Sequence, residues 1–199
     1  DSGKVLQVEG TLVARGTSSD GITFTSSAAS PAAGDWGFIK FKDSSMDAAF
    51  DGNGAYLSGS VFEHATIEYA GGSVTPAVWA DSSAPYFNSV VVRNNAFTGI
   101  YSSNSDIRII NSTISYNYLN QVWSEYRGGG IDLVMASNVV ISNNTIANNF
   151  SYSFGGGIRV QLAQGASASV TNNTISNNVA RDRAGGMDLE VRSAISVTI

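Results

Sequence analysis

The sequence predicts an all-β fold, a parallel β-helix of about six to seven coils with three short strands in each. A seven-residue phrase with an apolar centre recurs at intervals of 23 to 32 residues, and intervals of this size are typical of solenoids. Apolar and polar residues alternate inside each phrase, and a period of two indicates a strand rather than a helix. We therefore expect the strands to stack as successive rungs of one solenoid.

The first strand of each coil is predicted from a glycine-rich phrase such as Gly-Gly-Gly-Ile-Asp-Leu at residues 128–133. Similar phrases occupy residues 36–41, 76–80, 98–102, 155–160 and 185–189. Because side chains alternate across a strand, one apolar residue of each phrase points inward. The predicted inward column is Ile39, Val78, Ile100, Ile131, Ile158 and Met187.

The second strand of each coil is predicted from pairs of apolar residues that lie two positions apart. The clearest pairs are Ile107/Ile109, Val139/Ile141 and Ala168/Val170. Such alternation is typical of a strand with one face in the core.

The third strand is the asparagine-rich phrase itself, as in Asn-Asn-Thr-Ile-Ser-Asn-Asn at residues 172–178. Its predicted inward column is Ile67, Val91, Ile114, Ile146 and Ile175. Asparagines stand on both sides, in columns of Asn88, Asn111, Asn143 and Asn172 and of Asn94, Asn117, Asn149 and Asn178. Stacked amides can bond along the solenoid, and asparagine tolerates the left-handed backbone of a sharp corner. We interpret these residues, and His64 in the first column, as structural.

Composition limits the partners. The chain has 199 residues, which fits a single domain over residues 1–199. The net charge is −5, and no basic run exists that would favour nucleic acid. No cysteine is present, and no apolar stretch is long enough to span a membrane.

No signal peptide is visible, and residues 194–199 look like the opening strand of a further coil. We expect the chain to be a fragment or processed piece of a longer protein.

The chain resembles the right-handed parallel β-helix proteins of the pectin-lyase-like superfamily, of the secreted bacterial type. The resemblance rests on residues 9–17, 22–26 and 34–41 and on the asparagine-rich phrase. It implies a right-handed solenoid and a secreted or cell-surface location. The superfamily includes polysaccharide lyases, glycoside hydrolases, adhesins and tailspikes, so the fold does not choose among these activities. No catalytic signature of these enzymes matches this sequence residue by residue.

One outward-facing column interrupts the surface of serine, threonine and asparagine. It consists of Lys40, Trp79, Tyr101, Asp132, Arg159 and Asp188, and is called the outward column below. Aromatic faces and charged groups in a row could form the floor of a groove for a sugar chain. The alternative is a packing ladder in which Arg159 bridges two carboxylates. Both interpretations stand at this point.

Three variable loops lead into the same face and add further candidates for ligand binding. They contribute Trp123, Tyr126, Arg127, Tyr152 and Arg181. Function tends to lie on loops above a rigid scaffold, so these side chains could form a wall beside the outward column.

Asp132 and Asp188 are the candidates for catalysis. They would lie two rungs apart, about 9.6 Å, at the upper edge of the separation in inverting glycosidases. Arg159 between them would favour the ionised form of both carboxyls and disfavour a general acid. Asp132, Asp182 and Asp188 could supply some oxygens to Ca²⁺, but no dense acidic cluster exists, so we predict no cofactor or metal.

The sequence thus favours a secreted or cell-surface binding or structural domain whose ligand is a polysaccharide. One alternative is a polysaccharide lyase or glycoside hydrolase that acts on the same face. A second alternative is a filament or adhesin subunit that associates end to end through unpaired backbone groups of its open coils.

Overall fold

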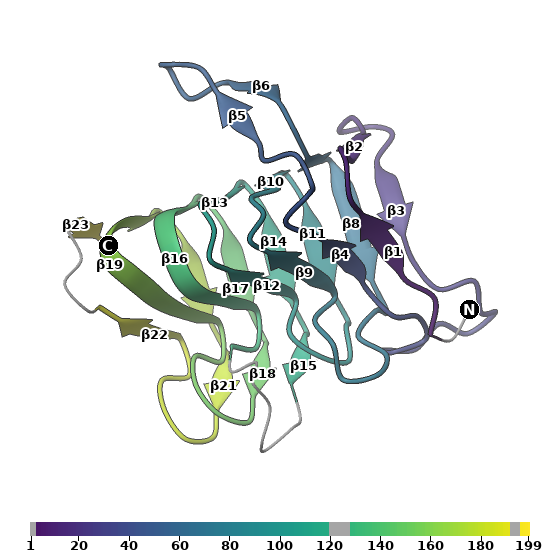
Figure 1. Cartoon of the computed structure of the whole chain (residues 1–199). Coiled ribbons are helices and arrows are strands. Elements are labelled where there is room, and N and C mark those ends of the chain that lie inside the picture. Colours follow the sequence, from purple (N-terminus) through teal and green to yellow (C-terminus); the bar gives the residue numbers. More distant parts are fainter. Residues whose placement is uncertain (1–2, 120–127, 192–195) are drawn as a thin grey trace.

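The computed structural model describes residues 3–119, 128–191 and 196–199 of the chain. Within these residues the regular structure is all β, and the strands wind into coils that stack along one axis (Figure 1). Equivalent strands of successive coils pair in parallel, as in β4 (Ile39–Phe41) with β9 (Val78–Asp81) and β14 (Thr113–Ser115) with β17 (Thr145–Ala147). The predicted parallel β-helix is confirmed. No helix of this described part is long and apolar enough to cross a membrane.

The strands form three columns that run the length of the solenoid. The first column holds β1 (Leu6–Val8), β4 (Ile39–Phe41), β9 (Val78–Asp81), β12 (Ile100–Ser103), the first parts of β16 (Ile131–Ser142) and β19 (Ile158–Thr171), and β22 (Met187–Glu190). The second holds β2 (Val13–Arg15), β7 (Val61–Glu63), β10 (Tyr86–Asn88), β13 (Ile107–Ile110), the later parts of β16 and β19, and β23 (Ser196–Thr198). The third holds β3 (Ile22–Phe24), β8 (Ala65–Glu68), β11 (Val91–Arg93), β14 (Thr113–Ser115), β17 (Thr145–Ala147) and β20 (Thr174–Ser176).

Two smaller sheets complete the fold. A three-stranded parallel sheet joins β15 (Tyr118–Leu119), β18 (Phe150–Ser151) and β21 (Val179–Ala180). The antiparallel hairpin of β5 (Ala49–Phe50) and β6 (Tyr56–Ser58) lies between β4 and β7 in the chain and projects from the solenoid (Figure 1). The hairpin was not predicted, and it forms one wall of the site described below.

The core is a column of apolar side chains, as alternation predicts. The first-strand register pairs Ile39 with Val78, and the same alignment continues through Ile131 and Ile158. Towards the N-terminal end the core is aromatic. The ring of Phe62 meets that of Phe41 edge to face at 5.7 Å and lies nearly parallel to that of Phe87 at 5.4 Å.

The structure corrects the predicted register of one coil by a single residue. Val92, not Val91, pairs with Ile67 and Ile114, and Val92 is fully buried while Val91 is half-buried on the outer face. Residues 90–92 are all valine, so apolar residues stand on both faces and alternation cannot fix the register. The same shift moves the neighbouring asparagine column from Asn94 to Asn95.

The two residues of each Asn-Asn pair in the repeated phrase have different structural roles. The first member of a pair adopts a left-handed backbone at the corner, as in Asn143 with a φ of 58° and Asn148 with a φ of 58°. The second member, Asn144 or Asn149, points into the solenoid and is buried. His64, with a φ of 48°, occupies the same corner column as Asn143. Asn111, Asn143 and Asn172 are therefore corner residues, and within this column Asn111 Nδ2 also donates to Asn88 Oδ1 at 2.9 Å.

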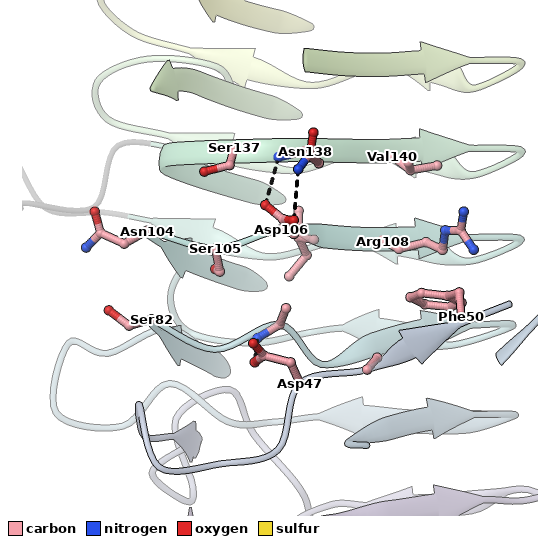
Figure 2. Close-up of a pocket in the computed structure, with 13 residues that line it drawn as sticks. Asp47, Phe50, Ser82, Asn104, Ser105, Asp106, Arg108, Ser137, Asn138 and Val140 are labelled. Atoms are coloured by element: carbon pink, nitrogen blue, oxygen red, sulfur yellow. Dashed lines mark hydrogen bonds between the residues drawn. The ribbon is translucent and has the colours of Figure 1, made fainter. Parts of the chain in front are cut away.

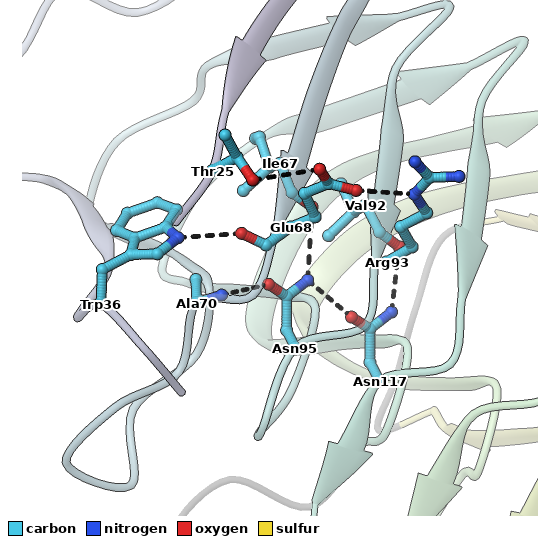
Figure 3. Close-up of polar contacts among 9 residues, drawn as sticks. All are labelled: Thr25, Trp36, Ile67, Glu68, Ala70, Val92, Arg93, Asn95 and Asn117. Carbon is cyan, nitrogen blue, oxygen red and sulfur yellow. Dashed lines mark hydrogen bonds and ion pairs between the residues drawn. The ribbon is translucent and has the colours of Figure 1, made fainter. Parts of the chain in front are cut away.

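The buried asparagines form a continuous ladder of hydrogen bonds. Asn95 Nδ2 donates to Asn117 Oδ1 at 2.8 Å, and Asn117 Nδ2 donates to Asn149 Oδ1 at 2.9 Å. Asn149 Nδ2 then donates to Asn178 Oδ1 at 3.0 Å. At its N-terminal end the ladder accepts a hydrogen bond from the amide of Ala70, which lies near the buried Glu68 (Figure 3). These bonds satisfy polar groups that burial would otherwise leave unpaired.

The ladder also explains the glycine-rich phrase. A Cβ atom on Gly130 would lie 2.9 Å from Asn149 Nδ2, and a Cβ on Gly157 would lie 2.8 Å from Asn178 Nδ2. Both positions must therefore lack a side chain for the amides to stack at this spacing. The glycine-rich phrase and the asparagine-rich phrase therefore depend on each other, because the glycines leave the space that the asparagine amides occupy.

Candidate functional site

The structure confirms the alignment of the outward column but not its exposure. Strand pairing places Lys40 beside Trp79, Tyr101 beside Asp132, and Arg159 beside Asp188. These side chains do project from one face of successive rungs. Their surroundings, however, differ along the solenoid.

Asp132 and Arg159 are buried, which agrees with the packing interpretation of the outward column and not with an open groove floor at these two residues. Arg159 Nη1 lies 3.0 Å from Asp132 Oδ1, and the side chains are 9% and 0% exposed respectively. The glycine-rich chain before each strand lies close to these residues. A Cβ on Gly128 would lie 2.9 Å from the Cβ of Asp132, and one on Gly155 would lie 2.9 Å from the backbone nitrogen of Arg159. Asp132 is thus not accessible as the general acid or base of a pair with Asp188.

Trp79 and Tyr101 are half-buried and pack as a ladder. Lys40 Nζ lies 3.5 Å from the centre of the Trp79 ring, a cation–π contact. The rings of Trp79 and Tyr101 meet edge to face at 6.4 Å, and Phe38 packs on Trp79 at 6.0 Å. These contacts match the packing interpretation of the outward column. A ligand role for Trp79, Tyr101 and Asp188 stays a prediction.

The loop candidates fall into two groups. Trp123, Tyr126 and Arg127 lie outside the described residues. Tyr152 and Arg181 lie together, because the guanidinium of Arg181 stacks 4.7 Å above the Tyr152 ring and Nη1 donates to its hydroxyl. Within the described ranges, no three His, Asp or Glu side chains converge as metal ligands would.

A groove that the sequence did not reveal lies beside the β5–β6 hairpin and is called the hairpin groove below. Its volume is about 410 Å³. It crosses three successive coils and is closed on one side by the segment that carries the hairpin (Figure 2). Its lining consists of Asp47, Ala48, Phe50, Ser82, Ala84, Asn104, Ser105, Asp106, Ile107, Arg108, Ser137, Asn138 and Val140.

Polar contacts position the two carboxylates of the hairpin groove. Asp106 accepts hydrogen bonds from the backbone nitrogen of Asn138 at 3.0 Å and from its Nδ2 at 2.9 Å (Figure 2). Ser167 Oγ donates to Asn138 Oδ1 at 2.9 Å and so fixes this amide from the next coil. Asp47 Oδ1 accepts from the backbone nitrogen of Ala84 at 2.7 Å. Asp47 and Asp106 both remain exposed.

The hairpin itself forms because Asp51 organises its turn. Asp51 Oδ1 accepts hydrogen bonds from the backbone nitrogens of Asn53 and Ala55, each at 2.9 Å. Gly54 has a φ of 83°, which suits glycine. A two-stranded hairpin is marginal in isolation, so contacts with the solenoid must hold it.

Those contacts come from Arg108 and Tyr86. Arg108 Nη1 donates to the carbonyl of Gly54 at 2.8 Å, and its guanidinium lies 4.2 Å from the Phe50 ring centre. The Tyr86 ring meets Phe50 edge to face at 5.0 Å and stacks with Tyr56 at 6.0 Å. Burial under the hairpin raises the pKa of the Tyr86 hydroxyl above its ordinary value. Arg108 therefore ties the hairpin to the floor of the groove.

The hairpin groove combines carboxylates, amides and hydroxyls with small apolar surfaces from Ala48, Ala84 and Val140. A site of this mixture can bind a ligand with many hydroxyls, because donors and acceptors converge around apolar patches. A weak signal for it exists in the sequence. The interval from Ile39 to Val78 is longer than those that follow and contains the turn sequence Asp-Gly-Asn-Gly at residues 51–54.

Comparison with known families agrees with this architecture. The family model described as a right-handed β-helix region matches residues 50–199. No curated protein and no solved structure matches the chain significantly. The match covers most of the chain and includes the coils that form the floor of the hairpin groove. The chain belongs to the right-handed β-helix family.

Proposed function

We propose that this chain is the binding domain of a secreted or cell-surface protein and that it binds a polysaccharide in the hairpin groove. The observation that supports the proposal most is the direction of the groove. Its lining comes from three successive coils, and two rung steps correspond to about 10 Å along the solenoid axis. A site elongated in this way suits a ligand that is itself a chain.

The chemistry of the lining supports the same ligand class. Sugar hydroxyls donate to carboxylates and amide oxygens and accept from amide nitrogens, and all of these groups line the groove. Asp106 and Asn138 are held by hydrogen bonds to each other, so little side-chain entropy is lost when a ligand binds there. Charge-assisted bonds to Asp47 and Asp106 would add strength.

A glycoside hydrolase is the second candidate, because Asp47 and Asp106 line the same groove. Two carboxylates on either side of a glycosidic bond are what hydrolysis requires. Release of new reducing ends from a bound polysaccharide, without formation of an unsaturated sugar, would identify such an enzyme. Binding without release identifies a binding domain.

Asn104 offers a sharp test of the binding site. Its side chain is exposed in the groove, and its left-handed φ of 51° means that glycine can replace it without backbone strain. Asn143 is a matched control, because it is also exposed, has a φ of 58° and lies outside the groove lining.

The experiment is a glycan array with the parent chain, followed by titration of Asn104→Gly and Asn143→Gly against the glycan that binds. We expect Asn104→Gly to weaken binding about fivefold or more, because a hydrogen bond to the ligand is lost. Asn143→Gly should leave the affinity unchanged. An array on which no glycan binds, or equal affinity of the two variants, would overturn the proposal.

A further inference from the structure

The negative charges of the hairpin groove are exposed, whereas its positive charge is half-buried. Asp47 and Asp106 are exposed on the lining, whereas Arg108 is half-buried and is the only cationic residue among the lining residues. An acidic lining distinguishes ligands by their own charge, because like charges at short range oppose binding.

Arg108 already contacts the hairpin through its guanidinium group. Its Nη1 is bonded to the carbonyl of Gly54, and its guanidinium lies against the Phe50 ring. A ligand carboxylate that recruited this guanidinium would compete with the contacts that keep the wall of the groove in place. The two aspartates have no such conflict, because each accepts from backbone or amide groups of the scaffold and keeps acceptor capacity for a ligand.

We infer that the hairpin groove selects polysaccharides without carboxylates and favours chains that carry protonated amines. The inference rests on the proposed function and specifies its ligand class. A uronate residue would bring a third carboxylate to Asp47 and Asp106, and among the described residues that line the groove the cation is Arg108, which already contacts the hairpin. An amino sugar would instead place a cation between two fixed anions, and each exposed pair contributes a small favourable free energy.

The surroundings of the groove have the same sign. Asp51 lies in the hairpin turn, and Asp81 precedes the lining residue Ser82. The chain as a whole has a net charge of −5. A polyanion would therefore meet repulsion on approach as well as in the groove, and this repulsion weakens as salt screens it.

The test is a binding array of three glycan classes at a pH where amines are protonated and carboxylates are ionised. The probes are β-glucan and mannan oligomers as neutral chains, chitosan oligomers as amine-bearing chains, and polygalacturonate and alginate oligomers as polyuronates. The variants are Asp47→Asn and Asp106→Asn, singly and together. Asp182→Asn is the control, because it makes the same charge change at an exposed residue outside the groove lining.

We expect amine-bearing chains to bind more tightly than neutral chains, and we expect no binding by polyuronates. The double variant should weaken the binding of amine-bearing chains about fivefold, and added salt should have a similar effect. Equal binding of neutral and amine-bearing chains would overturn the preference for amines. The control should bind like the parent. Binding of a polyuronate that Asn104→Gly abolishes would overturn this inference and leave the proposed function intact. Binding of no glycan at all would overturn the proposed function and this inference with it.

Discussion

Asn117 donates its side-chain Nδ2 to Oδ1 of Asn149 at 2.9 Å, although 32 residues separate the two in sequence. The backbone nitrogen of Asn117 donates to the same oxygen at 3.1 Å. Each inner asparagine of the ladder thus accepts a hydrogen bond from the asparagine of the preceding coil and donates one to the asparagine of the following coil. The ladder links neighbouring coils by side chains as well as by strand pairing.

Asn149→Ala should therefore be strongly destabilising. The substitution removes the acceptor of two bonds from Asn117 and the donor to the carbonyl of Ile114. Buried groups left without partners cost about 1–3 kcal/mol each, so we expect a loss of about 2–4 kcal/mol. Chemical denaturation measures it. Asn148→Gly, a neighbouring left-handed corner, is the control and should change the unfolding free energy by less than about 1 kcal/mol. Equal effects of the two variants would contradict the ladder.

The corrected register is tested by two adjacent valines. Val92→Asp would place a charge in a fully buried column and should abolish cooperative unfolding. Val91→Asp changes a half-buried residue on the outer face and should leave a folded protein. Circular dichroism during thermal unfolding separates the two outcomes. A folded Val92→Asp variant beside an unfolded Val91→Asp variant would restore the register that the sequence alone suggested.

Most of the fold could be predicted from the repeats, because the same position recurs once in every coil and its residue type can be compared from coil to coil. The single-residue error arose where the repeat is weakest, at three consecutive valines. The solvent exposure of a side chain was harder to predict than the face of the strand on which it lies. Alternation places Asp132 on the outer face correctly, but no strand pattern encodes the close approach of Gly128 to the Cβ of Asp132.

The hairpin groove was missed for a related reason. Its lining comes from an insertion and from corners of three coils, so no local motif contains it. The groove exists because Arg108 and Tyr86 hold residues 50–56, and those contacts join segments more than 25 residues apart. The expected lack of a cofactor or metal and the alternative of end-to-end association stay predictions.

Stability near the N-terminal coils should depend on acid through Glu63. Burial by itself would raise the pKa of the Glu63 carboxyl, but hydrogen bonds from Arg15 and Asn88 and the charge of Arg15 outweigh it and hold this pKa below its ordinary value. The stabilisation is therefore present above the pKa of the unfolded chain and is lost as pH falls through the lower folded value.

Glu63→Gln should remove this part of the acid sensitivity. Because Arg15 is largely exposed, we expect a loss of only about 0.5 kcal/mol near neutral pH. Below the folded pKa of Glu63, the variant and the parent should be equally stable. Urea unfolding over a pH series measures the difference, with Glu9→Gln as an exposed control. A difference that grows towards low pH would contradict this assignment.

Arg108 should control the order of the hairpin. Arg108→Met retains the length of the side chain but removes the bond to Gly54 and the cation–π contact with Phe50. We expect faster amide exchange in residues 49–58 and weaker glycan binding, with little change in the exchange of core strands such as β14. Arg93→Met is a suitable control, because Arg93 pairs with Glu68 on another face. Unchanged exchange in the hairpin would show that Arg108 does not hold it.

The location of the ligand site is tested most directly by a two-dimensional NMR titration of the chain with the glycan that binds on the array. We predict that the backbone signals of Ala48, Asn104 and Asn138 shift first and most, while the indole signal of Trp79 stays in place. The opposite result, with large shifts at Trp79 and Tyr101 and none at Asn104, would contradict the assignment of the hairpin groove and would place the ligand on the outward column.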